Sequence, residues 1–357
     1  MSSEVEETVI EASEDDEQDV ILFQYSITSY GADYPVESLV RRMRDGDIFI
    51  PPFQRGYVWN LVEASGFVET LLLGLPVPGI FLSKEYESRK MLVIDGQQRL
   101  RTLQYFYDGV FEPTQHVFAL RGVQPQFAGL TYKALQEEDR RRLDDSIIHL
   151  TIVRQDEPSD DDSSIYHIFE RLNTTGRVLS PQEIRACLFH GEFHRVLGQL
   201  NQDNDWRSVF GPVNTRMRDQ ELILRFLALH FRGDKYSRPM KGFLNTYMKL
   251  NRHLQRQSED QLTAAFLPTI HAITQAVGTK AFRPRRALNA AVFDAVMIGV
   301  AHRLAQGGIH DHTAIDAAYQ GLLAHEDFIR TTQEHTSDEE AVVRRIALAS
   351  AAFAAVK

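Results

Sequence analysis

The pattern of apolar and polar positions divides the chain into a mixed front half and a helical back half. In the front half, short apolar runs typical of strands lie at 47–50, 80–82, 91–94 and 147–153, and helical periodicity covers 36–44, 61–73, 97–108 and 165–172. From about residue 193 onward the periodicity is helical, with candidate helices at 220–231, 243–255, 261–277, 287–306, 313–323 and 338–356. The pattern predicts an α+β fold: a small mixed sheet with packed helices, followed by an all-helical C-terminal half.

One junction in the front half combines a strand, a turn and a helix. The apolar run 91–94 leads directly into Asp-Gly-Gln-Gln-Arg at 95–99, and Gly109 supplies a stop for the helix that follows. This geometry places free backbone N–H groups and the positive end of a helix dipole beside Arg99, which suits a phosphate. A turn that binds nothing is the alternative, but the glutamine and arginine side chains exceed what capping needs.

A second helix start is predicted near residue 180. Ser180 is the candidate N-cap, Pro181 fits the first helical position, and Glu183 completes a capping box. Ahead of it, the sequence Asn-Thr-Thr-Gly at 173–176 breaks the helical run 165–172.

Composition is typical of a soluble globular protein. The 357 residues, 43% hydrophobic and 25% charged, suffice for two or three domains. No apolar run is long enough to span a bilayer, and the first residues do not resemble a signal sequence. A single cysteine, Cys187, forbids an internal disulfide, so we expect a cytoplasmic location and a packing role for this side chain.

Charge is concentrated at the N-terminus. The formal net charge is −10, and residues 1–19 hold nine acids without Lys or Arg, which leaves about −1 on the rest. We therefore predict an acidic disordered tail at 1–19. Basic clusters at 41–44, 140–142 and 283–286 are interpreted as solvated faces rather than DNA-binding surfaces, because acids lie near most of them. The acidic run 160–162 is interpreted as a solvated loop rather than a metal site.

Three motifs now follow one another along the front half. They are Ile-Pro-Pro-Phe-Gln-Arg at 50–55, Ile-Asp-Gly-Gln-Gln-Arg at 94–99, and Leu-Asn-Thr-Thr-Gly at 172–176 with Leu-Ser-Pro-Gln-Glu at 179–183. This series resembles the ParB/sulfiredoxin-like superfamily, and more closely its DGQQR branch, found as the N-terminal domain of GmrSD-type modification-dependent restriction systems. The resemblance covers about 20–192 and implies a ParB-like nucleotide-binding domain there, followed by a helical domain at 193–357.

The resemblance also implies a ligand, a nucleoside triphosphate with Mg²⁺. The implied nucleotide-binding residues are Gln54, Arg55, Gly96, Gln97, Gln98, Arg99, Thr102, Asn173 and Gly176. Arg55 and Arg99 would neutralise phosphate charge, and the catalytic candidates are Asp95, Gln98 and Arg99. Asp95 and Asn173 are the candidate metal ligands, with simple turn formation as the alternative role of Asp95.

The leading hypothesis is a nucleotide-binding, NTP-hydrolysing regulator or sensor of a prokaryotic DNA-restriction or phage-defence system. GmrSD-type proteins join this domain to an HNH-like nuclease, but His310-Asp311-His312 has no convincing partner ligands downstream and is interpreted as a helix cap. The expected partners are therefore nucleotide, DNA, a nuclease subunit and a second copy of the chain, with no membrane.

Two other functions remain open. The first is a non-catalytic DNA-binding module in which Tyr57 and Trp59 stack on a base, although packing at the core edge is the favoured role of both side chains. The second is a degenerate ParB-like scaffold whose helical half binds other proteins.

Overall fold

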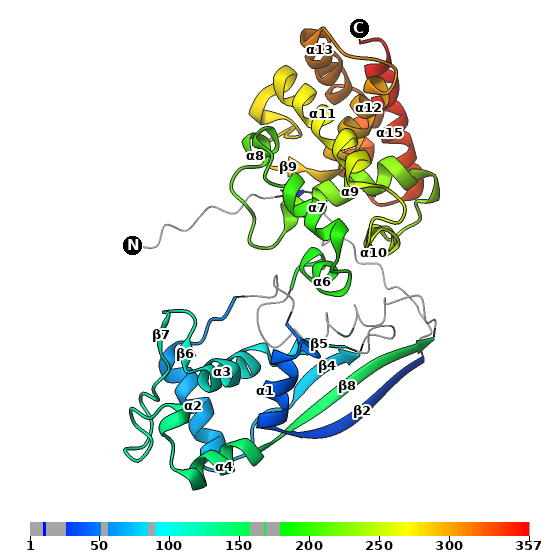
Figure 1. Cartoon of the computed structure of the whole chain (residues 1–357). Coiled ribbons are helices and arrows are strands. Elements are labelled where there is room, and N and C mark those ends of the chain that lie inside the picture. The colour runs from blue at the N-terminus through cyan, green and yellow to red at the C-terminus, as the bar shows by residue number, and fades with distance from the viewer. Residues whose placement is uncertain are drawn as a thin grey trace. The chain divides into compact units, whose positions relative to one another are not determined.

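The computed structural model describes residues 10–11, 26–50, 56–84, 90–157, 168 and 179–356. The chain divides into two compact units, which we call the sheet unit (23–178) and the helical unit (1–22 with 179–357) (Figure 1). The division precedes the predicted helix start at Ser180, so that helix belongs to the helical unit.

The sheet unit is built on a five-stranded mixed sheet with the order β2–β8–β4–β5–β3. Its strands are β2 (Ser26–Pro35), β3 (Ile48–Phe49), β4 (Ile80–Lys84), β5 (Met91–Asp95) and β8 (Ile147–Glu157). Strand β8 is antiparallel to β2 and parallel to β4, while β5 is antiparallel to β4 and parallel to β3. Strand β5 therefore has a neighbour on each side, which fixes the position of the turn that follows it.

Four helices lie beside this sheet, and the side chains on the face that they cover are buried in the core (Figure 1). They are α1 (Val36–Arg44), α2 (Leu61–Leu72), α3 (Gln97–Asp108) and α4 (Glu137–Asp145), and a small hairpin joins β6 (Val110–Phe111) to β7 (His116–Val117). Along β8, Ile148 and Leu150 are fully buried whereas Ile147 is 54% exposed, the alternation expected where helices cover one face. Phe106 of α3 completes the core against Phe118, with ring centroids 5.2 Å apart.

The helical unit contains ten α-helices in its described part. They are α6 (Pro181–Leu188), α7 (Glu192–Leu200), α8 (Asn204–Phe210), α9 (Arg218–Arg232), α10 (Met240–Leu250), α11 (Glu259–Val277), α12 (Ala290–Leu304), α13 (His312–Leu323), α14 (Glu326–Gln333) and α15 (Glu339–Ala354). A two-residue strand β1 (Ile10–Glu11) pairs in parallel with β9 (Leu288–Asn289). No described helix has both the length and the apolar character needed to cross a bilayer.

Helix α12 forms the centre of the helical unit, with twelve consecutive buried residues from Ala290 to Ala301. Gly299 permits the close approach of α15, because a Cβ at this position would lie 2.9 Å from the backbone of Ala349. The fully buried Asp294 accepts hydrogen bonds from Arg225 of α9 and Arg345 of α15. These charges bind three helices together, so their desolvation is offset by mutual pairing.

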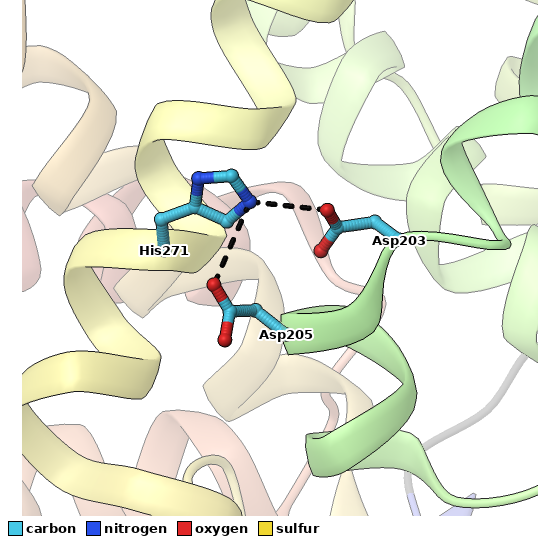
Figure 2. A group of neighbouring side chains, drawn as sticks. All are labelled: Asp203, Asp205 and His271. Atoms are coloured by element: carbon cyan, nitrogen blue, oxygen red, sulfur yellow. Dashed lines mark hydrogen bonds and ion pairs between the residues drawn. The ribbon is translucent and has the colours of Figure 1, made fainter.

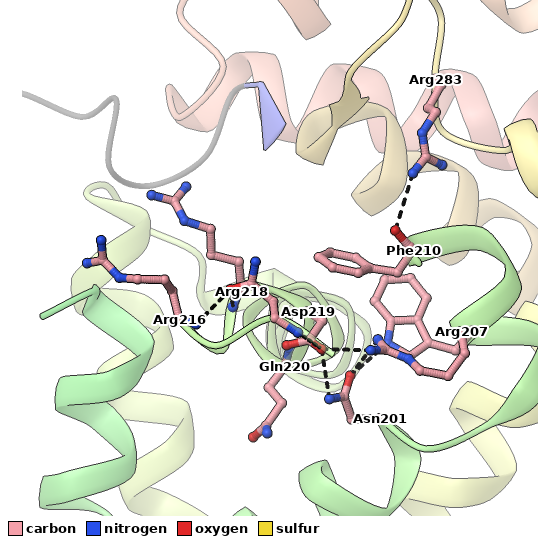
Figure 3. A network of polar contacts seen from close by, with 10 residues as sticks. Asn201, Arg207, Phe210, Arg216, Arg218, Asp219, Gln220 and Arg283 are labelled. Atoms are coloured by element: carbon pink, nitrogen blue, oxygen red, sulfur yellow. Dashed lines mark hydrogen bonds and ion pairs between the residues drawn. The ribbon is translucent and has the colours of Figure 1, made fainter. Parts of the chain in front are cut away.

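A second buried polar network surrounds the start of α9 (Figure 3). Asp219 Oδ2 accepts hydrogen bonds from Asn201 Nδ2 at 2.9 Å, Arg207 Nη1 at 2.9 Å and the Asn214 amide at 3.0 Å. Asn201 in turn accepts from the indole of Trp206, which is fully buried. The carboxylate thereby fixes the connection between α8 and α9.

The structure confirms the predicted fold class and most predicted elements. The strands near 47–50, 80–82, 91–94 and 147–153 and the helices at 36–44, 61–73 and 97–108 are present within one to four residues of the expected bounds. In the back half, all six candidate helices exist. Nearly all of the predicted helix 165–172 lies outside the described residues.

Several predicted helix boundaries were wrong, and for two of them a hydrogen bond explains the difference. Helix α12 begins at Ala290 rather than 287, because Leu288 and Asn289 are extended in β9 and the Asn289 side chain caps the helix. Helix α10 ends at Leu250 rather than 255, because Asn251 Oδ1 accepts hydrogen bonds from the backbone of Arg256 and Gln257. In both places a side chain that bonds to the backbone competes with helix continuation.

Candidate functional site: the turn between β5 and α3

Gly96 makes the turn between β5 and α3 and is the N-cap residue of the helix. Its φ of +101° lies in the left-handed region, which favours glycine. A Cβ on this residue would also lie 2.8 Å from Cγ1 of Ile80 on β4. Conformation and close packing therefore both require glycine here.

The start of α3 has no side-chain cap. The first intrahelical bond runs from the Leu100 amide to the Gly96 carbonyl at 3.0 Å. The amides of Gln97, Gln98 and Arg99 precede this bond and have no intrahelical acceptor. Together with the helix dipole, these three donors form an arrangement that can bind an anion.

The Arg99 guanidinium forms hydrogen bonds within the sheet unit. It donates to the carbonyls of Pro78 at 2.6 Å and Gly79 at 2.5 Å, and to Asp95 Oδ2 at 2.8 Å. The Arg99 side chain is only 14% exposed, whereas that of Asp95 is 45% exposed. These contacts give Arg99 a positioning role: it attaches the loop before β4 to the turn. The predicted phosphate contact of Arg99 stays a prediction.

Gln98 connects the turn to the segment that follows the first motif. Its Oε1 accepts from the Val58 amide at 3.0 Å, and its Nε2 donates to the Gly56 carbonyl at 3.4 Å. Thr102, one turn along the helix, donates to the Gln98 carbonyl at 2.7 Å and hydrogen-bonds to the Tyr57 hydroxyl at 2.6 Å. The predicted residues Gln98 and Thr102 thus hold residues 56–58, which follow the first motif, against the second motif.

Two polar atoms on another face of α3 lack partners. Gln97 Oε1 and Arg101 Nε are both buried, and neither has a hydrogen-bond partner. The two residues are four positions apart and so lie next to each other on the helix surface. Among the residues that the structure describes, the Arg101 side chain forms one long hydrogen bond of 3.5 Å, from Nη1 to the Tyr105 hydroxyl. Buried polar groups normally have partners, so this acceptor and this donor are available for a further hydrogen bond.

Arg101 was not among the site residues expected from the sequence. It lies two residues beyond the Asp-Gly-Gln-Gln-Arg motif, where a basic residue on a helix is normally interpreted as a solvent contact. The spacing Gln97–Arg101 placed both side chains on one face and was available from the sequence. The lack of partners for these two side chains could not be predicted from the sequence.

Tyr57 and Trp59 pack against the core of the sheet unit. The Tyr57 ring lies 5.1 Å from that of Tyr105 and 5.8 Å from that of Phe111, and Trp59 lies 5.7 Å from Phe67. Burial raises the pKa of Tyr57 to about 12. The favoured prediction of a core-edge role is confirmed, and stacking of these rings on a DNA base stays a prediction.

Four predicted site residues, Gln54, Arg55, Asn173 and Gly176, lie outside the described residues, as does the acidic run 160–162. Their roles stay predictions. Cys187 lies on α6, and its side chain is not among those described.

The described part of the third motif, residues 179–183, forms a capped helix start, which we call the closed helix start. The Ser180 hydroxyl accepts from the Glu183 amide, and Glu183 Oε2 accepts from the Ser180 amide, which confirms the predicted capping box. The Ser180 hydroxyl also donates to the Arg216 carbonyl at 2.7 Å. Pro181 has no N–H, so this helix start keeps few donors for a ligand.

Two further polar sequences have partners within the protein. Asp311 caps α13 by accepting from the amides of Thr313 and Ala314, which confirms the capping interpretation of the His-Asp-His triplet. Hydrogen bonding to Thr313 lowers the pKa of this carboxyl. In the basic cluster 140–142, Arg141 pairs with Glu137 and Arg142 with Glu138, as expected of a solvated face.

Comparison with known proteins yields one family. Residues 36–190 match the family described as GmrSD restriction endonuclease, N-terminal domain. The matched region begins with α1 and ends two residues after α6, so it includes both the turn at Gly96 and the closed helix start at Ser180. The match supports placing this region in the GmrSD N-terminal domain family. No curated protein matches the chain.

Proposed function

We propose that this protein binds a nucleoside triphosphate at the start of α3 and thereby regulates a prokaryotic DNA-restriction or phage-defence system. The restriction theme follows from the match of residues 36–190 to the N-terminal domain of GmrSD restriction endonucleases. The finer proposal, a ParB-like nucleotide site of the DGQQR type, rests on the motif sequence and on the geometry of the turn.

The unpaired polar atoms at the start of α3 carry the proposal. The amides of 97–99 can donate hydrogen bonds to a phosphate. Arg101 can supply the positive charge, because Arg99 is already paired with Asp95. Gln97 Oε1 is an acceptor and therefore suits a hydroxyl or amino group of the nucleotide better than a phosphate.

Mg²⁺ binding and hydrolysis depend on Asp95 and Gln98. Arg99 contacts one carboxylate oxygen of Asp95, so the second oxygen of this half-exposed side chain is a candidate metal ligand. Gln98 would have to release the Val58 amide before its side chain could orient an attacking water. We therefore propose that nucleotide binding rearranges residues 56–58, and that hydrolysis follows from this rearrangement.

The test is a titration of the full chain with ATP, GTP and CTP, with and without Mg²⁺. The two readouts are the melting temperature and the release of phosphate. One nucleotide should raise the melting temperature, since a ligand at 100 times its Kd stabilises by about 2.7 kcal/mol. Arg101→Ala should weaken that nucleotide about 10–100-fold, the value of a charge-assisted hydrogen bond of about 1.5–3 kcal/mol, without lowering the melting temperature of the free protein.

Two further variants serve as controls. Arg141→Ala removes an exposed helix arginine paired with Glu137 and should leave nucleotide affinity unchanged. Arg99→Ala should lower the melting temperature itself, because it removes the bonds to Pro78, Gly79 and Asp95. Wild-type affinity in Arg101→Ala, or no response of the wild type to any of the nucleotides, would contradict the proposal.

A further inference from the structure

Three metal-ligating side chains meet at the surface of the helical unit, in a different unit from the nucleotide site (Figure 2). Asp203 and Asp205 flank the first residue of α8, and His271 lies in the middle of α11. His271 Nε2 is 3.1 Å from Asp203 Oδ2 and 3.6 Å from Asp205 Oδ2. One ligand atom from each residue falls within 4.8 Å of the other two.

These separations agree with the dimensions of a coordination shell. Ligand atoms about 2.0–2.1 Å from a tetrahedral zinc ion are about 3.3 Å from one another. The two measured distances to the imidazole nitrogen lie on either side of that value. An imidazole with two carboxylates is a donor set that suits zinc and neighbouring first-row metals.

The backbone holds two of the three groups in place. Asp203 Oδ1 accepts from the Trp206 amide at 3.0 Å as the N-cap of α8, which orients Oδ2 toward His271. His271 is fixed by its position on the nineteen-residue helix α11. The Asp205 side chain is 37% exposed and can adjust to a metal at small cost, while the 40% exposure of His271 leaves room for an ion to enter from solvent.

We propose that Asp203, Asp205 and His271 bind a divalent first-row transition metal, with Zn²⁺ as the reference ion and water in the remaining position. The metal connects α8 to α11 beside Trp206, whose indole is bonded to the Asp219 network through Asn201. It thereby stabilises the helical unit. The competing interpretation is that His271 only hydrogen-bonds to the carboxylates and that the cluster binds no metal.

The test uses the full chain, treated with EDTA and dialysed, and then titrated with Zn²⁺ by calorimetry and with Co²⁺ by visible absorption. We expect one site per chain that is sensitive to Asp205 and His271, and a rise in melting temperature with Zn²⁺. Asp205→Asn and His271→Gln should each weaken this site more than 10-fold, since loss of a group that only orients a ligand already costs about 10–100-fold.

His335→Ala provides the matched control, because His335 is an exposed histidine 3.9 Å from a single carboxylate, Asp338. It should bind Zn²⁺ as the wild type does. The metal-free melting temperatures of the variants show whether each one folds, and Asp203 is left unchanged because it also caps α8. Absence of Zn²⁺ and Co²⁺ binding by the wild type overturns the proposal, as does equal affinity in His271→Gln and His335→Ala.

Discussion

Helices α3 and α6 both begin within a motif of the matched region, yet their first turns are built in opposite ways. Helix α6 begins at Ser180 with a complete capping box and a proline that lacks an N–H. Helix α3 begins at Gly96 with no side-chain cap, and buried polar atoms of Gln97 and Arg101 remain unpaired. A motif can thus supply its own cap at one helix start and leave polar groups without partners at another. Whether side chains of the protein itself satisfy the polar groups separates the two cases.

The largest effect on the free energy of unfolding is expected from adding a methyl group at Gly96, the N-cap residue of α3. Gly96→Ala would force a left-handed conformation on alanine and bring its Cβ to 2.8 Å from Ile80. We expect a loss of about 2–4 kcal/mol in the free energy of unfolding, the sum of strain and overpacking, measured by urea denaturation.

Gly109 offers the matched control at the other end of α3. Its φ is also positive, +80°, but a Cβ there would meet nothing within 4 Å. Gly109→Ala should therefore cost only the backbone strain, about 1–2 kcal/mol. Equal losses in the two variants would show that packing against Ile80 has no part in the requirement for Gly96.

The second effect is a pH dependence of stability that arises next to α6. His194 on the next helix, α7, is largely buried, and burial together with the nearby His190 lowers its pKa to about 4. Since the unfolded chain binds the proton near pH 6.5, it binds more protons than the folded protein between pH 4 and 6.5. Stability should therefore fall as the pH drops through this window, by about 2–3 kcal/mol at pH 4.5 relative to pH 7.5.

Chemical denaturation at the two pH values, followed by a probe in the helical unit, measures this loss. His194→Gln should flatten the dependence, while His335→Ala, which removes an exposed histidine, should leave it unchanged. A wild-type stability that is constant between these pH values would contradict a neutral, buried His194.

The smallest effect is expected at the closed helix start. Ser180→Ala removes the cap of α6 and the hydrogen bond to the Arg216 carbonyl, with an expected loss of about 1–2 kcal/mol and no change in nucleotide affinity. Ser258→Ala removes the same type of capping box from α11, and within the described part of the chain Ser258 has no additional bond like that of Ser180 to the Arg216 carbonyl. Thermal melts should show the smaller loss for Ser258→Ala. Reduced nucleotide binding in Ser180→Ala would show that α6 belongs to the ligand site after all.

Strand β2 shows why one element was not predicted from the sequence. Its residues Ser26–Pro35 include Gly31 and lack a clear apolar alternation, and the strand lies at the edge of the sheet, paired only with β8. Gly31 lies against the ring of His149 on β8, where a Cβ would be 2.7 Å from Cε1. An edge strand buries little of its own surface, so the hydrophobic pattern that identifies a strand is weak.

The local features of the chain could be read from the amino-acid sequence alone. The strand, glycine turn and helix at 91–108 and the capping box at 180–183 were predictable, because backbone conformation and capping depend on residues within one helical turn of each other. Only the tertiary structure decided the partners: Arg99 donates to carbonyls twenty and twenty-one residues away, and Asp203 lies 68 residues from His271. The unpaired atoms of Gln97 and Arg101 belong to the second class, because whether a polar group has a partner depends on every segment that packs around it.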